Sequence, residues 1–135
     1  MPHVSRRKVD SRALKKIANF LLVALTDIKD RKEMMLFANC FFTKTERVML
    51  AKRLGIAYLL SLNVPEETIA EILGVGRPTV EKMRLIIRSD HEGYDVALKV
   101  LRKSEMFEEF KQVFTDILKY MDNPYKGIYR RAYGV

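Results

Sequence analysis

The sequence has little of what several structural classes require. Among its 135 residues there is one cysteine, no tryptophan, six glycines and four prolines. With Cys40 alone, no intrachain disulfide can form and no cysteine-based zinc site can be built. The apolar run FANCFF surrounds Cys40 and predicts that this side chain lies in the core.

Long apolar runs are also missing. The longest charge-free stretch, Leu54 to Pro65, has 12 residues, whereas a membrane-spanning helix needs roughly 20 apolar residues in a row. The basic start MPHVSRRKVDSR is not followed by an apolar stretch with a small-residue cleavage site, so no secretory signal is expected. We therefore expect a cytoplasmic protein with no membrane partner.

Acidic residues are too few to balance the basic ones. The formal net charge is +8, from 25 Lys and Arg against 17 Asp and Glu. The excess is localised, because residues 1–16 carry 6 basic groups and 1 acidic group, and residues 75–103 carry 7 and 4. Such a distribution suits a polyanion, most often nucleic acid, because neutralising phosphates releases counterions.

Apolar residues recur at three- and four-residue spacing and predict an all-α fold. One helix is expected from Ser11 to Ile28 and another from about Asp30 to Asn39. A capping box at Thr43 and Glu46 begins a third, which reaches Leu62. Residues 54–60 leave no polar face on that helix, and the first two helices are also rich in apolar residues. This surplus predicts an intertwined homodimer, with a tightly packed helical monomer as the alternative.

Residues 66–85, EETIAEILGVGRPTVEKMRL, have the spacing of a helix-turn-helix. Small Ala70 allows two helices to approach, and Gly74 can adopt the left-handed conformation that ends the first of them. Gly76 occupies the cap position of the second helix, whose first turn tolerates Pro78. The pattern favours DNA binding, although similar tri-helical units also occur in proteins that bind only other proteins.

The second of these helices carries the candidate DNA contacts. Its inward stripe is Val80, Met83 and Ile87. The first turn of a recognition helix reaches the major groove, so base-edge and phosphate contacts are expected from Arg77, Thr79, Glu81 and Lys82. Backbone phosphate contacts are expected from Arg84 and Arg88, and from the arm residues Arg6, Arg7 and Lys8. For Glu81 we favour the simpler interpretation, in which it pairs with Arg77 and Arg84 at helical spacing.

Four segments together resemble a known family. With the capping box, LAKRLGIAYLL, TIAEILGVGRPTVEKMR and GYDVAL, the sequence resembles the Trp repressor family over roughly residues 18–103, especially its small YerC/YecD-like relatives. The resemblance implies an all-helical, interlocked dimer. In such a dimer two helix-turn-helix units read successive major grooves of a near-palindromic site.

The resemblance also implies where an amino-acid co-repressor would lie, since the Trp repressor holds one with two arginines and a threonine near the capping box. Thr43 and Arg53 match two of these positions, but the recognition-helix arginine falls on Lys82. A lysine lacks the planar fork that grips a carboxylate through two bonds. We therefore expect no co-repressor and no other cofactor, the alternative being a small carboxylate near these three residues.

The expected organisation has four parts: an arm at 1–9, a Trp-repressor-like helix-turn-helix domain at 10–103, an additional amphipathic helix at 104–121 and a basic, aromatic tail at 122–135. The additional helix should pack on its own dimer. Its apolar stripe is Met106, Phe107, Phe110, Val113, Phe114, Ile117, Leu118 and Met121. The tail interleaves tyrosines with basic residues, which suits stacking on bases, and disorder is the alternative.

These features predict a sequence-specific transcription regulator that binds duplex DNA as a homodimer and associates with the nucleoid. The alternative is a protein–protein adaptor of the transcription or replication machinery. An enzyme is not expected, because no Gly-rich phosphate loop follows a strand and no nucleophile–base pair is suggested. No metal site is expected either, since His3 and His91 lie outside any metal-ligand spacing.

Overall fold

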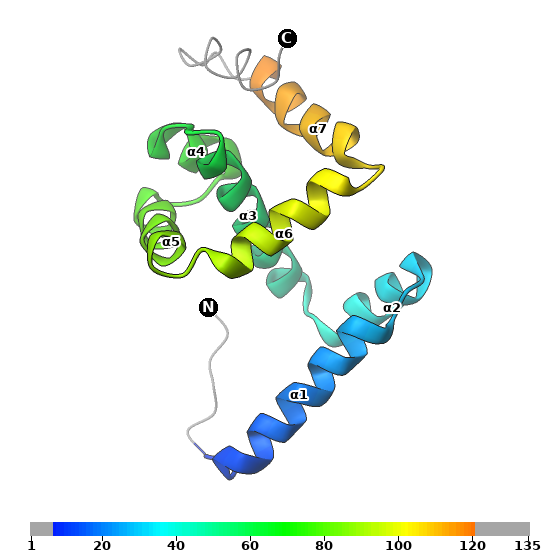
Figure 1. Cartoon of the computed structure of the whole chain (residues 1–135). Helices are drawn as coiled ribbons and strands as arrows, with labels where there is room; N and C mark the ends of the chain where they lie inside the picture. Colours follow the sequence, from blue (N-terminus) through cyan, green and yellow to red (C-terminus); the bar gives the residue numbers. More distant parts are fainter. Residues whose placement is uncertain (1–6, 121–135) are drawn as a thin grey trace. The chain divides into compact units, whose positions relative to one another are not determined.

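The computed structural model describes the backbone of residues 7–120 and the side chains of residues 7–117. Within this part the chain forms seven α-helices and no strand, which confirms the all-α prediction (Figure 1). The chain divides into two compact units, residues 1–50 and 51–135, and each is described by itself. The four-part division at 9, 103 and 121 stays a prediction.

The first unit holds α1 (Ser11–Asp27), α2 (Arg31–Phe41) and the beginning of α3 (Lys44–Ser61). Polar side chains start these helices: Asp10 and Asp30 accept backbone N–H bonds in α1 and α2. At α3 the Thr43 hydroxyl oxygen accepts from the Glu46 N–H at 3.1 Å, as the capping box predicts. The Glu46 carboxylate accepts from the Thr43 hydroxyl at 2.9 Å, instead of reaching the Thr43 N–H.

Neither α1 nor α2 has a buried residue within the chain. Phe20 is 73% exposed and Leu36 is 70% exposed. Cys40 is exposed as well, so the prediction that it lies in the core is wrong for the single chain. Apolar sequence around a residue predicts burial only when a second layer covers that helix face.

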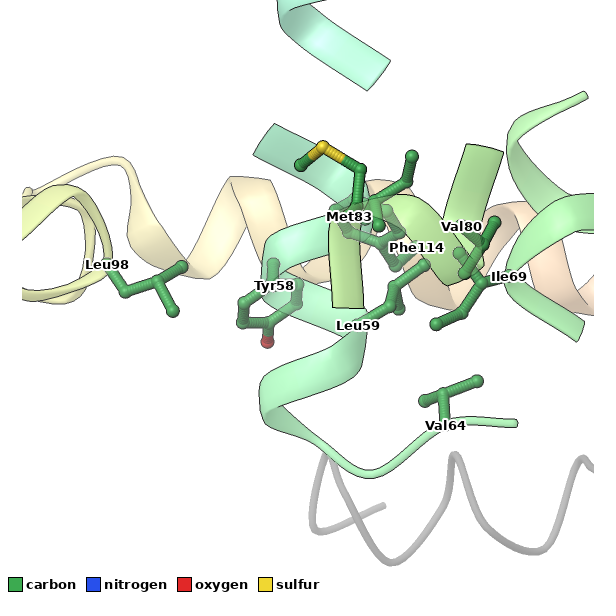
Figure 2. Packing of buried hydrophobic residues seen from close by; sticks show 9 residues of the cluster. Tyr58, Leu59, Val64, Ile69, Val80, Met83, Leu98 and Phe114 are labelled. Carbon is green, nitrogen blue, oxygen red and sulfur yellow. The ribbon is translucent and has the colours of Figure 1, made fainter. Parts of the chain in front are cut away.

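The second unit contains the core. It is built from the second half of α3 together with α4 (Glu66–Leu73), α5 (Arg77–Ser89), α6 (Glu92–Lys103) and α7 (Phe107–Tyr120). Figure 1 shows α4 and α5 as a pair of short helices beside α3, with α6 leading on to α7. The most deeply buried apolar side chains are Ile56, Leu59, Ile69 and Val80, several of which Figure 2 shows together.

Aromatic rings of α7 cover α3. The Tyr58 ring centroid lies 6.2 Å from that of Phe107, 4.8 Å from Phe110 and 5.4 Å from Phe114. Gly55 permits the close approach of α4, since a Cβ there would lie 3.1 Å from a methyl of Leu73, whereas its 3.6 Å distance from the Phe114 ring would be ordinary contact. The second half of α3 is therefore buried by its own chain, and the prediction that it needs a second copy is wrong.

The stripe of α7 is only partly packed. Phe114 is buried, whereas Met106 is 44% and Val113 is 53% exposed. The Leu118 side chain, Met121 and the tail lie outside the described residues. Of the helices described, none is long and apolar enough to cross a membrane.

Candidate nucleic-acid interface

The turn between α4 and α5 is closed by backbone hydrogen bonds. Gly74 ends α4 with φ 59° and ψ 46°, a left-handed conformation that glycine adopts without steric cost. The Val75 N–H donates to the Ala70 carbonyl at 3.0 Å and the Gly74 N–H to the Glu71 carbonyl at 3.4 Å, which is the Schellman pattern. The predicted role of Gly74 is thus confirmed.

The second helix then starts as its sequence predicts. Gly76 is the N-cap of α5 and Pro78 lies in the first turn, where its missing N–H has no intrahelical partner to lose. Val80 and Met83 are buried, and Ile87 is half-buried, so the inward stripe is confirmed. The Tyr94 hydroxyl donates to the Met83 sulfur at 3.6 Å and helps to fasten this face to α6.

The opposite face of α5 points to solvent. Of the predicted contact residues on this helix, those exposed are Arg77, Thr79, Glu81, Lys82 and Arg88. Arg84 differs, because its side chain is only 34% exposed and forms an ion pair with Glu66 of α4. Glu66 therefore holds Arg84 against α4, and the phosphate contact expected of Arg84 stays a prediction.

The ion pairs of α5 are not the ones predicted. Arg77 pairs with Glu67 of α4, with 2.9 Å between Nη1 and Oε1. Glu81 has no ion-pair partner among residues 7–117, so the interpretation that it pairs with Arg77 and Arg84 is wrong. Glu81 is at helical spacing from both arginines. The two arginines pair instead with Glu66 and Glu67 in the first turn of α4, which crosses α5.

The glutamates of α4 offset the positive charge of α5. Residues 66–88 contain four basic and four acidic residues, so the helix-turn-helix itself is neutral. The window 75–103 gave a positive charge because it left out the three glutamates of α4. Within the described part of the chain Lys82 and Arg88 have no salt bridge, and they are the basic groups of α5 that remain uncompensated.

Comparison with known families agrees with this geometry. The family described as Trp repressor protein matches residues 16–102. The chain belongs to the Trp repressor family. It is therefore a member of a family of helix-turn-helix DNA-binding regulators, as the sequence resemblance implied. No curated protein and no solved structure gave a match. The matched region stops within α6, so α7 is an addition to the part shared with the Trp repressor family.

The residues expected at a Trp-repressor-like co-repressor site fall in both units: Arg53 and Lys82 in the second and Thr43 in the first. Arg53 lines a cavity of about 330 Å³ together with Ile86, Asp90 and Tyr94, but Lys82 is not among its lining residues. Asp90 would repel a carboxylate ligand. Thr43 belongs to the first unit, where it caps α3 through Glu46. The expectation that no amino-acid co-repressor binds therefore stays a prediction.

The remaining predicted residues lie elsewhere. Arg7 and Lys8 are exposed and precede α1, whereas Arg6 lies outside the described residues. The His91 and Asp95 side chains are in contact at the exposed start of α6, with 2.7 Å between Nδ1 and Oδ2. In the described part of the chain no group of three or more His, Cys, Asp or Glu side chains could hold a metal ion.

Three residues of the interface escaped the sequence analysis. Glu66 and Glu67 pair with the arginines of α5, and the Lys52 ammonium donates to the Gly74 carbonyl at 3.0 Å. The doublet of acidic residues in the first turn of α4 was a visible signal, since such residues are favoured there by the helix dipole. Its partners could not be identified without the crossing of the two helices.

Proposed function

We propose that this member of the Trp repressor family is a sequence-specific, duplex-DNA-binding transcription regulator that acts as a homodimer through residues 66–85. The observation that carries the proposal is the first turn of α5. It is exposed to solvent while the same helix is anchored by buried Val80 and Met83. A recognition helix needs this combination of a fixed orientation and a free N-terminal turn.

The proposed contacts follow from exposure and charge. Arg77, Thr79 and Lys82 reach base edges and nearby phosphates of the major groove, and Arg88 reaches the backbone. Glu81, which has no ion-pair partner within the described residues, is suited to accept a hydrogen bond from a cytosine amino group. The arm residues Arg6, Arg7 and Lys8 add contacts to phosphates that do not depend on sequence.

Dimerisation is supported by the first unit. Its helices expose large apolar side chains that a folded chain normally covers: Ile17, Phe20, Leu22, Met35, Leu36 and Phe41. Exposed apolar side chains in this number mark a protein interface, and a second copy is the partner that closed symmetry provides. Two recognition helices in one dimer also give a symmetric reader of duplex DNA.

Selection of bound sequences from a random duplex pool tests whether the protein recognises a specific DNA sequence. The expected product is a site with two-fold symmetry and half-sites about one helical turn apart. Recovery of asymmetric single half-sites would count against a dimeric reader. A protein that shifts no duplex at low salt would favour the adaptor alternative.

The oligomeric state is tested by light scattering on wild-type protein and two variants. Wild type should have the mass of a dimer at micromolar concentration, and Phe20→Asp should give a monomer because it places a charge in the apolar surface of α1. Leu85→Asp is the matched control, since Leu85 is also apolar and 54% exposed but lies on the outer face of α5. A dimer that survives Phe20→Asp unchanged would exclude the α1 surface.

This proposal includes no amino-acid co-repressor and places the protein in the cytoplasm, on nucleoid DNA. Calorimetric titration with the twenty amino acids should therefore give no binding heat. A clear saturating signal that is lost in Arg53→Gln would show that a carboxylate site exists after all.

A further inference from the structure

Glu81 is the acidic residue of α5. Its side chain is exposed, and it forms no salt bridge within the described residues. The two glutamates at the start of α4 differ, because Glu66 and Glu67 are paired with Arg84 and Arg77. The two arginines at helical spacing from Glu81 are thus engaged by α4, which leaves the Glu81 carboxylate open to an incoming ligand.

The position of Glu81 on α5 belongs to the face proposed to meet DNA. Val80 and Met83 are buried and define the inward face of this helix. Glu81 lies one turn before Leu85, which is 54% exposed, and next to exposed Lys82. A carboxylate here does not attract DNA, because the phosphates repel it. It favours binding only where a base offers it a hydrogen-bond donor.

We propose that Glu81 makes DNA binding depend on the free N4 amino group of one cytosine, so that the protein distinguishes this cytosine from the other bases and from its N4-methylated form. This role rests on the proposed function, in which α5 enters the major groove. It goes beyond a favourable contact, because Glu81 then decides the base at one position and rejects a modified base there.

The carboxylate affects binding in two ways. It loses water and lies among phosphates on every duplex, so this cost is common to all sequences and cannot select between them. The compensation differs, because only cytosine N4 and adenine N6 present donors in the major groove, whereas guanine O6 and N7 and thymine O4 are acceptors that repel the carboxylate. Adenine N7 lies beside N6 and repels the second carboxylate oxygen. Cytosine is therefore the base that Glu81 favours.

The N4 amino group of cytosine has two hydrogens, and Watson–Crick pairing uses one of them for guanine O6. The other points into the major groove and is the one available to Glu81. In a paired N4-methylcytosine the methyl group takes the place of this second hydrogen, while the pair with guanine is kept. The modified base presents no donor to the carboxylate, so the protein should treat it as a mismatch. A mismatched base pair lowers affinity by about 5-fold to 150-fold.

Selection from a random duplex pool identifies the position that Glu81 reads. Full-length wild type, Glu81→Gln and Glu71→Gln are compared, and circular dichroism verifies that each is folded. Glu81→Gln should change the preference at one position of the half-site from cytosine to adenine, because an amide accepts from N6 and donates to N7. Glu71 is the matched control, since it is exposed and has no salt bridge within the described residues but lies on α4. Its substitution removes the same charge and should leave every base preference unchanged.

A modified duplex then tests the dependence on the amino group. Fluorescence anisotropy measures binding to the selected duplex with N4-methylcytosine at that position of one half-site. Wild type should lose about 5-fold to 150-fold in affinity, and the loss should largely disappear in Glu81→Ala, which has no acceptor there. The same modification at a cytosine of the flanking DNA controls for its effect on the duplex and should leave the affinity unchanged.

The inference is overturned if Glu81→Gln alters no base preference, if it tightens binding to all duplexes equally, or if the altered position is not a cytosine for wild type. It is also overturned if N4-methylation leaves wild type unaffected or weakens wild type and Glu81→Ala by the same factor. Selection with wild type tests the proposed function separately. If wild type enriches no sequence, both the proposed function and this inference fail. If it enriches a two-fold symmetric site and only the Glu81 effects are missing, the inference alone fails.

Discussion

The Nζ atom of Lys52 lies 3.0 Å from the carbonyl oxygen of Gly74 and donates a hydrogen bond to it. Lys52 belongs to α3 and Gly74 is the left-handed residue that ends α4. A cation at the C-terminal end of a helix also interacts favourably with the helix dipole. This contact ties the turn of the helix-turn-helix to α3, and so helps to fix the direction in which α5 leaves the core.

Gly74→Ala should lower the free energy of unfolding by about 1 to 2 kcal/mol, measured by urea denaturation with circular dichroism. The cost arises from the backbone, because an added Cβ would meet only the Lys52 Nζ at 3.8 Å while φ is +59°. Gly93→Ala is the control, since its Cβ would enter open space within α6. This variant should be neutral or gain up to about 1 kcal/mol from helix propensity. Equal effects of the two substitutions would contradict the left-handed turn.

Thr68→Val should stabilise the protein. Thr68 is 1% exposed, and its hydroxyl has no hydrogen-bond partner among the described residues. A buried polar group without a partner costs about 1 to 3 kcal/mol, and valine has nearly the same shape without that group. Thermal unfolding should show a higher midpoint for Thr68→Val, whereas exposed Thr45→Val should change stability by less than about 0.5 kcal/mol. A lower midpoint for Thr68→Val would show that its hydroxyl is satisfied in solution.

Phe114→Ala should destabilise the fold by about 3 to 5 kcal/mol, because the ring is buried against Tyr58 and its loss leaves a cavity. Val113→Ala, one residue away and 53% exposed, should change stability by less than about 0.5 kcal/mol. Urea denaturation can be followed by tyrosine fluorescence, since the chain has no tryptophan. If both substitutions have the same small effect, α7 does not pack on α3 in solution.

Arg77→Ala should weaken binding to the selected duplex by about 1 to 3 kcal/mol and relax the preference at one base position, because a groove-facing arginine pairs with a particular base edge. The measurement is anisotropy against the selected duplex and against single-base variants of it. Equal weakening of selected and random duplexes would contradict a base contact.

The basic arm, unlike Arg77, is expected to bind DNA independently of its sequence. Neutralising it with Arg6→Gln, Arg7→Gln and Lys8→Gln together should weaken all duplexes alike. Each lost phosphate contact lowers the slope of log affinity against log salt by about 0.9 in magnitude, so the three changes lower it by at most roughly 2.7 per arm. An unchanged slope would show that the arm does not touch DNA.

The sequence by itself determined the helices and the turn, because their signals are local. Asp10, Asp30 and Thr43 cap helices through backbone groups two or three residues away. Gly74 and Gly76 likewise act within a few residues of their own positions. The inward stripe of α5 followed from helical periodicity alone, and the four matching segments were enough to indicate the Trp repressor family.

Only the tertiary structure decided which side chains meet. The Glu67–Arg77 pair spans 10 residues and the Lys52–Gly74 hydrogen bond spans 22, and both depend on how helices cross. Periodicity states which face of a helix is apolar but not which helix covers it. For that reason the burial of Tyr58 under α7, the exposure of Cys40 and the lack of an ion-pair partner for Glu81 among the described residues could not be predicted correctly from the sequence.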